Sequence, residues 1–206
     1  MAVNSQGASS PALVVVGWSS AWQTWGMSSV LARRLLEVCQ LQGQFILRSG
    51  EASTEYFDKY LFESDPALLI EVANAMVDLL EPCDVLAGME MGGIPLVTVL
   101  SQVTGLPAVF VRKAPKDYGT CKAVEGISVR GLRVVAVEDV VTTAGALIAG
   151  CQELRAAGAT VDVALCAIDR DQGGGAALAA RGVILRAAVD RSDLDGILRQ
   201  TQKRVE

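Results

Sequence analysis

Two adjacent carboxylates stand at the end of an apolar run in the middle of the chain. Glu138 and Asp139 follow the apolar residues 134–137 and precede a stretch of small residues from Thr142 to Ala146. Backbone N–H groups where such a turn opens a helix attract an anion, and carboxylates accept hydrogen bonds from sugar hydroxyls. The pattern therefore indicates a site for a sugar phosphate, and the alternative is an ordinary strand, turn and helix with an acidic pair on the surface.

A cluster of positive charge follows the apolar residues 108–111. Arg112, Lys113 and Lys116 lie close together on a polar loop that contains Gly119. A mobile cationic loop can close over a pyrophosphate group, exclude water and stabilise the charge of a leaving group. A solvated basic loop is the alternative, which charge alone would favour.

Three further segments carry groups that could bind a ligand. Arg170 follows the apolar residues 161–168 and could hold a carboxylate through two parallel hydrogen bonds, although an arginine in an exposed turn would look the same. Residues 88–93 are a glycine-rich turn of the kind that presents backbone amides to pyrophosphate. Arg48, in Phe-Ile-Leu-Arg-Ser-Gly, indicates by itself no more than a hairpin with an exposed arginine.

The composition excludes several kinds of chemistry. The 206 residues include no histidine, which rules out a Ser-His or Cys-His nucleophile pair and any histidine-ligated metal. The five cysteines lie far apart, so we expect reduced, mostly buried thiols in a cytoplasmic protein. A net charge of −5 argues against general nucleic-acid binding, and no apolar run is long enough for a membrane span. Catalysis must then depend on carboxylates, lysines, arginines, backbone amides or a metal that the substrate brings.

The elements that must position these groups alternate along the chain. Apolar strands that do not alternate with polar residues, separated by helices, predict a parallel sheet covered on both faces, with ligands beyond the carboxyl ends of its strands. The strands are expected at residues 85–87, 108–111, 134–137, 161–168 and 183–189, with extended segments at 45–47 and 56–62. The helices are expected at residues 28–39, 66–80, 94–103, 144–157, 176–180 and 193–203.

The first part of the chain differs in composition from the rest. Residues 1–26 are rich in Ser, Gly and Ala and hold all three tryptophans, Trp18, Trp22 and Trp25. We expect a poorly ordered N-terminal extension with no part in the chemistry, the alternative being that the tryptophans dock on the domain. Residues 27–206 are expected to form a single domain.

Several of these segments resemble the motifs of a known family. Residues 134–146 resemble the site for 5-phosphoribosyl-1-pyrophosphate (PRPP) in the type I phosphoribosyltransferases, and residues 112–120 resemble the catalytic loop of the orotate phosphoribosyltransferases. Residues 45–57 and 88–95 are similar to that family's hood segment and pyrophosphate turn. The resemblance implies an α/β type I phosphoribosyltransferase fold, with a central parallel sheet flanked by helices and a small N-terminal hood over about residues 28–62.

The resemblance also implies roles for individual residues. Glu138 and Asp139 would hold the ribose hydroxyls, and Lys116 would neutralise the leaving pyrophosphate, so these three are the expected catalytic residues. The other expected PRPP contacts are Arg48, Arg112, Lys113, Tyr118, Val140, Val141, Thr142, Thr143, Ala144, Gly145 and Ala146. The expected orotate contacts are Thr142, the backbone at Tyr56 and Phe57, and Arg170, which would bind the orotate carboxylate.

Four positions depart from the family pattern. Ala144 stands where glycine is usual, so we expect its methyl group to crowd the 5'-phosphate and weaken PRPP binding. Ala146 replaces a hydroxyl residue, and Tyr118 stands where histidine is common but can still donate a hydrogen bond. Gly92 stands where some members carry a lysine, which would remove one cationic contact.

The resemblance implies an enzyme that transfers the phosphoribosyl group of PRPP to orotate, giving orotidine 5'-monophosphate and pyrophosphate in pyrimidine nucleotide biosynthesis. Mg²⁺ would be held mainly by PRPP and not by the protein, and a homodimer would share its active sites across the interface. The alternatives are a related transferase that acts on another base and a regulator that binds PRPP without catalysis.

Overall fold

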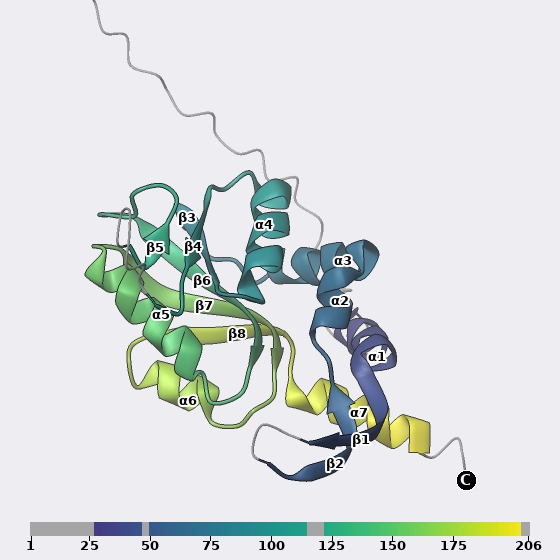
Figure 1. The fold of residues 1–206 in the computed structure, drawn as a ribbon. Helices are drawn as coiled ribbons and strands as arrows, with labels where there is room; N and C mark the ends of the chain where they lie inside the picture. Colours follow the sequence, from purple (N-terminus) through teal and green to yellow (C-terminus); the bar gives the residue numbers. More distant parts are fainter. Residues whose placement is uncertain (1–26, 47–49, 115–121, 203–206) are drawn as a thin grey trace, which may run out of the picture.

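The centre of the molecule is a six-stranded sheet with the strand order β5-β4-β3-β6-β7-β8. The computed structural model describes residues 27–46, 50–114 and 122–202, and the expected N-terminal extension lies outside these ranges. Figure 1 shows the sheet with helices on both sides. Its strands are β3 (Val85–Met89), β4 (Ala108–Val111), β5 (Val124–Glu125), β6 (Arg133–Val141), β7 (Thr160–Asp169) and β8 (Ile184–Val189).

All the neighbouring strands of this sheet run parallel except β4 and β5, which are antiparallel. The prediction of a parallel sheet is therefore confirmed for five strands and wrong for the short β5, which lies in the segment expected to be loop. Its two residues gave no run long enough to be read as a strand. The sheet is mixed and mostly parallel.

Two layers of helices cover the sheet. One core contains Leu35, Leu68 and Leu96, from α1, α3 and α4, packed with Val135 and Val137 of β6. The other contains Leu147 and Leu178, from α5 and α6, packed with Val134 and Ala136 of β6. The helices are α1 (Met27–Cys39), α2 (Tyr60–Ser64), α3 (Pro66–Val77), α4 (Gly93–Thr104), α5 (Gly145–Ala156), α6 (Gly174–Ala179) and α7 (Arg191–Gln202). Because both faces of β6 are covered, its apolar residues need not alternate with polar ones.

Local signals explain where two of these helices begin and end. Asp65 caps α3, since its carboxylate accepts hydrogen bonds from the N–H groups of Ala67 and Leu68, and Pro66 occupies the first helical position. Helix α4 ends at Gly105, which adopts the left-handed conformation with φ of 74°. Helix α3 is shorter than expected, because the N–H groups of Leu79 and Leu80 bond to Met76 and Val77 in a turn beyond it.

The hood consists of an antiparallel hairpin, β1 (Gln40–Ile46) and β2 (Ala52–Phe57), attached to α1 and α7. Figure 1 shows the hairpin projecting from the body of the molecule below α1. Helix α1 is tied to the C-terminal helix by a hydrogen bond from Ser28 Oγ to Asp193 Oδ1 of 3.1 Å. Helices α1 and α7 therefore bring the two ends of the described chain together beside the hood.

Two further expectations about local structure were wrong, and both concern the site. Residues 56–62 were expected to be extended, but α2 begins at Tyr60 because the Asp58 carboxylate accepts a hydrogen bond from its N–H group, at 3.1 Å. Strand β6 continues to Val141 and includes Glu138 and Asp139, because β7 pairs with it as far as Asp169. In the described part of the chain, no helix is long and apolar enough to cross a membrane.

Candidate active site

The carboxyl ends of four strands meet at one edge of the sheet. The Glu90 N–H group, beyond β3, bonds to the Val111 carbonyl at the end of β4 at 2.8 Å. The Arg170 N–H group, beyond β7, bonds to the Val141 carbonyl at the end of β6 at 2.9 Å. The glycine-rich turn, the acid pair and Arg170 therefore lie along one edge, as expected for ligand sites in a sheet of this kind.

The acid pair is buried at this edge. Asp139 is 0% exposed and Glu138 is 8% exposed. The Asp139 N–H group donates to Glu138 Oε1 at 3.1 Å, and Asp139 Oδ1 accepts from the Val140 N–H group at 2.6 Å. The two side chains are thus held by the backbone of their own strand.

Two residues reach the acid pair from the hood junction, which is the segment between β2 and the end of α2. The sequence analysis identified neither. The ammonium group of Lys59 lies 2.5 Å from Asp139 Oδ2, and the Glu63 carboxyl is close enough to the Asp139 carboxyl for each to shift the pKa of the other. Lys59 and Glu63 are four residues apart at the start of α2, which places them on one face of the helix. The signal was available: Asp58 is a residue that starts helices, and treating it as such would have brought both side chains to one side.

Burial and crowding shift the pKa values of these groups in opposite directions. Burial, together with the neighbouring Asp139 carboxylate, raises the pKa of Glu138 to about 9 and that of Glu63 to about 8. Burial alone would raise the pKa of Asp139, but hydrogen bonds from Glu138, Glu63 and Lys59 hold it below its ordinary value. The cluster at neutral pH is therefore one carboxylate, one ammonium and two protonated carboxyls.

This arrangement predicts a pH-dependent stability above pH 6. Unfolded glutamates titrate near about pH 4.3. Between that pH and the raised folded-state pKa of about 8, the folded chain keeps a proton on Glu63 that the unfolded chain releases, so the free energy of unfolding falls as pH rises. Replacing Glu63 with glutamine is expected to make the melting temperature less dependent on pH between 6 and 8. Calorimetric melting of Glu63→Gln and of Glu153→Gln, a surface substitution on α5, measures this; equal slopes in the two variants would contradict it.

The turn after the acid pair is open to a ligand. Thr142, Thr143, Gly145 and Ala146 are exposed, whereas Val141 and Ala144 are buried. Ala144 adopts the left-handed conformation with φ of 60°, which costs a non-glycine residue roughly 1 kcal/mol. The expectation that its methyl group crowds a phosphate does not fit this geometry, since Ala144 is only 6% exposed and packs in the core that contains Leu147 and Leu178.

Arg170 is a half-buried cation that faces an aromatic ring. Its guanidinium carbon lies 5.6 Å from the centroid of the Phe57 ring, and its Nε is buried with no hydrogen-bond partner among the described residues. Burial and the neighbouring Arg191 lower the pKa of Arg170. A guanidinium group beside another cation, with an unused N–H group, is suited to receive an anion.

Some of the other predicted contacts lie in the described part of the chain, and the rest lie outside it. The Lys113 N–H group donates to Glu90 Oε2 at 2.9 Å, so the start of the cationic loop lies against the glycine-rich turn. The Tyr56 ring stacks on Phe45 with a centroid distance of 5.4 Å. The predicted contacts that lie outside the described residues are Arg48, Lys116 and Tyr118.

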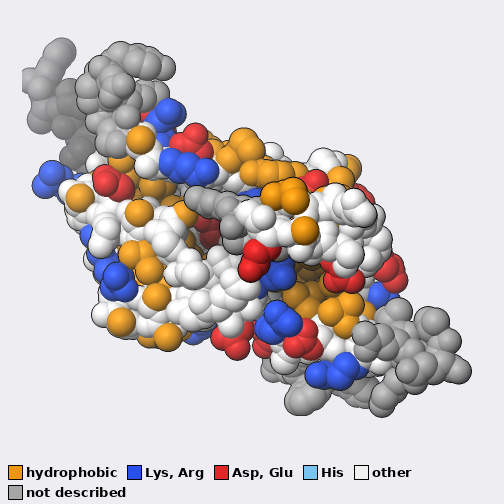
Figure 2. Space-filling view, turned by 60° about the horizontal axis from the view of Figure 1, so that its bottom comes forward, with side chains coloured by type: hydrophobic (Ala, Val, Ile, Leu, Met, Phe, Trp, Pro, Cys, Tyr) orange, Lys and Arg blue, Asp and Glu red, His pale blue; other side chains and the backbone are white. Residues whose placement is uncertain are grey.

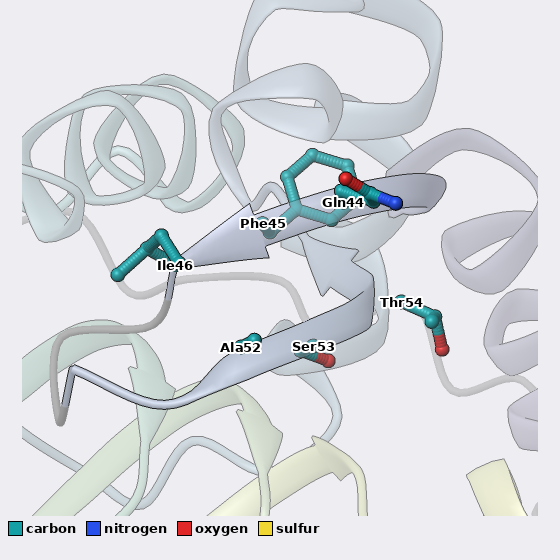
Figure 3. Close-up of a pocket in the computed structure, with 6 residues that line it drawn as sticks. All are labelled: Gln44, Phe45, Ile46, Ala52, Ser53 and Thr54. Atoms are coloured by element: carbon teal, nitrogen blue, oxygen red, sulfur yellow. The ribbon is translucent and has the colours of Figure 1, made fainter.

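An open hollow of about 520 Å³ lies on the hood and not at the acid pair. Figure 3 shows its lining along the two strands of the hairpin, which is formed by Gln44, Phe45, Ile46, Ala52, Ser53 and Thr54. None of these side chains is charged. The charged groups that could bind a sugar phosphate therefore lie at the sheet edge and not in this hollow.

The fold and the arrangement of groups at the sheet edge define a class of protein, the type I phosphoribosyltransferases. A family model described as the phosphoribosyl transferase domain matches residues 62–179. A crystal structure of orotate phosphoribosyltransferase from Aeropyrum pernix is 31% identical, covers 81% of this chain and 97% of that chain, and has a TM-score of 0.72. A structure of the Mycobacterium tuberculosis H37Rv enzyme in complex with Fe(III) dicitrate is 26% identical, covers 82% and 98%, and has a TM-score of 0.74.

Sequence relatives narrow the class. The orotate phosphoribosyltransferase of Nocardioides sp. is 52% identical over 170 residues, which are 82% of this chain and 95% of that protein. The orotate phosphoribosyltransferase of Methanocella arvoryzae is 45% identical over 156 residues, 75% of this chain and 89% of that protein. The chain belongs to the orotate phosphoribosyltransferase family.

Proposed function

We propose that this protein transfers the 5-phosphoribosyl group of PRPP to orotate, giving orotidine 5'-monophosphate and pyrophosphate for pyrimidine nucleotide biosynthesis. The observation that carries this proposal is the combination of a buried acid pair and an exposed turn with Arg170 at the same sheet edge. The acids and the turn suit a ribose phosphate, and Arg170 suits a planar carboxylate such as that of orotate.

Each group of residues at the site has a separate role in the reaction. Glu138 and Asp139 hold the ribose hydroxyls, and the N–H groups at the start of α5 hold the 5'-phosphate. Pyrophosphate leaves C1' with the electrons of the C–O bond, and N1 of orotate forms the new C–N bond from the opposite face, with inversion. The proton that N1 loses passes to the departing pyrophosphate. Arg112, Lys113 and Lys116 neutralise the departing pyrophosphate, and closure of their loop keeps water from C1'.

Magnesium fits this site through the substrate. Glu138 and Asp139 are engaged by neighbouring protein groups, and the described residues include no cluster of three or more acids or cysteines that could hold a metal ion. Mg²⁺ commonly binds substrate phosphates and keeps few protein ligands. Bound with PRPP, it would be held mainly by the substrate and would reduce the charge on the leaving group.

Arg170 favours orotate over other bases. Purines and uracil carry no carboxylate, so they would leave the buried Nε of Arg170 without a hydrogen-bond partner, which is costly. A transferase for another base is the second candidate, and a regulator that binds PRPP without catalysis is the third. Ala146, in the exposed turn, is the feature that favours the regulator, because the buried Ala144 does not crowd a phosphate.

We expect a cytoplasmic homodimer whose active sites lie at the subunit interface, with PRPP and orotate as its ligands. The four described cysteines are free thiols, three of them buried, which suits a reducing compartment. On the face in Figure 2, basic side chains are interspersed with acidic ones, and the net charge is −5, so we expect no nucleic-acid partner. We likewise expect no association with membranes.

A pyrophosphate-release assay tests the proposal. With PRPP and Mg²⁺, orotate is expected to support turnover, and uracil, adenine, guanine and hypoxanthine are expected to support little. Turnover with another base and not with orotate would establish the second candidate. Calorimetric binding of PRPP without pyrophosphate release from any base would establish the third.

A further inference from the structure

The ion pair at the acid site draws together two segments that are far apart in sequence. Lys59 is the residue that precedes α2, and Asp139 lies near the end of β6. The Lys59 ammonium contacts Asp139 Oδ2 at 2.5 Å. The lysine side chain is 33% exposed and that of Asp139 is 1% exposed, so the cation stands between the buried acid and the open edge of the sheet.

The pair lies against the glycine-rich turn. A Cβ atom added to Gly92 would meet Asp139 Oδ2 at 1.6 Å and Glu63 Oε1 at 2.8 Å. The carboxylate bound by Lys59 therefore occupies the space that a side chain at position 92 would need. The ammonium group is thus beside the turn whose amides are suited to bind pyrophosphate.

Lys59 is also the cation that acts on this cluster within the described part of the chain. It lowers the pKa of Glu63 and Glu138 through its charge, and no other cation contributes to either shift. A pyrophosphate group that approaches the Asp139 carboxylate needs a positive charge nearby. Lys59 is placed to supply it at short range.

We propose that Lys59 is a substrate-contacting residue, which exchanges its ion pair with Asp139 for one with the pyrophosphate of PRPP. This inference rests on the proposed function. Both oxygens of Asp139 have partners within the protein: Oδ1 accepts from Val140 N–H and Oδ2 faces the Lys59 ammonium. A ribose hydroxyl that bonds to Oδ2 takes the place of the ammonium, and the flexible four-carbon side chain of Lys59 lets that group move to the adjacent phosphate.

The exchange explains why a cation comes from the hood junction. The sequence places glycine at position 92, where a lysine would provide a cation directly from the turn, and the structure supplies one from α2 instead. The same short segment carries Phe57, whose ring lies against Arg170. Residues 57–59 thus touch both the base side and the pyrophosphate side of the site.

Binding of two fragments of the substrate separates a pyrophosphate contact from a structural role. Removing Lys59 alone would leave the buried Asp139 carboxylate without a charge partner, which is destabilising. The comparison is therefore made in the Asp139→Asn background. By calorimetry with Mg²⁺, Asp139→Asn/Lys59→Met is expected to bind inorganic pyrophosphate about ten- to a hundredfold more weakly than Asp139→Asn. Ribose 5-phosphate, which lacks the pyrophosphate, is expected to bind the two variants equally well.

A matched control and a conservative variant complete the test. Arg133, at the opposite end of β6, pairs with Asp84, and Asp139→Asn/Arg133→Met is expected to bind pyrophosphate as Asp139→Asn does. In the otherwise unchanged protein, Lys59→Arg is expected to retain more turnover than Lys59→Met. If methionine prevents folding, Lys59→Gln in the same background gives the same comparison.

Two outcomes would overturn the inference. Equal losses of affinity for pyrophosphate and for ribose 5-phosphate would show that Lys59 acts only through the fold, and unchanged pyrophosphate binding would show that it makes no contact. Failure of the proposed function looks different. The unmodified protein would bind pyrophosphate but release none from PRPP with orotate, and the comparison of variants would still decide the role of Lys59.

Discussion

Replacing Arg170 with leucine is expected to lower kcat/KM for orotate by about two to four orders of magnitude, because two charge-assisted hydrogen bonds contribute about 1.5–3 kcal/mol each. Leucine fills similar space against the Phe57 ring but offers no donor to a carboxylate. Binding of PRPP is expected to change little, since the proposed role of Arg170 is to bind the base and not PRPP. Steady-state kinetics with orotate and calorimetry with PRPP measure the two quantities separately.

A second base makes the Arg170 prediction specific. Uracil lacks the carboxylate of orotate, so any turnover with uracil is expected to be little affected by Arg170→Leu, and the preference for orotate shrinks accordingly. Arg191→Leu is the matched control, because Arg191 is a neighbouring cation that already pairs with Asp195 at 2.8 Å. An unchanged preference for orotate over uracil in Arg170→Leu would show that Arg170 does not bind the orotate carboxylate.

Replacing Gly93 with alanine is expected to destabilise the protein by about 1–3 kcal/mol or more and to abolish measurable PRPP binding. A Cβ atom at Gly93 would lie 2.4 Å from the Val137 carbonyl oxygen, one residue before the acid pair. The atom that this Cβ would meet belongs to the backbone of β6 and cannot rotate away, so the turn and β6 must move apart. Denaturant unfolding and calorimetry with PRPP measure the two effects.

Gly196, in α7, provides the control for this substitution. A Cβ atom there would meet nothing within 4 Å, so Gly196→Ala is expected to stabilise the protein by about 0.5–1 kcal/mol through helix propensity. Equal stabilities of Gly93→Ala and Gly196→Ala would mean that the close approach of β3, α4 and β6 is not required.

The sequence by itself determined the class of fold and most of the groups at the site. The strands around residues 85, 108, 134, 161 and 184 were recognisable because β-sheet residues buried on both faces must be apolar in a continuous run. The acid pair was recognisable because two carboxylates at the end of such a run are unusual without a ligand. Arg170 was recognisable because it follows the next strand of the same sheet. Each of these signals is local, so neighbouring residues along the chain suffice to read it.

Only the tertiary structure decided which groups meet the acid pair and in what state. Glu63 lies on a one-turn helix that the local pattern did not reveal, and Lys59 directly precedes that helix. Both reach Asp139 from a distance of about eighty residues in sequence. The burial of Ala144 and the position of Arg170 over Phe57 likewise depend on how separate elements pack. The raised pKa values of Glu63 and Glu138 follow from that packing, since desolvation and the field of a neighbouring carboxylate exist only once distant parts of the chain are brought together.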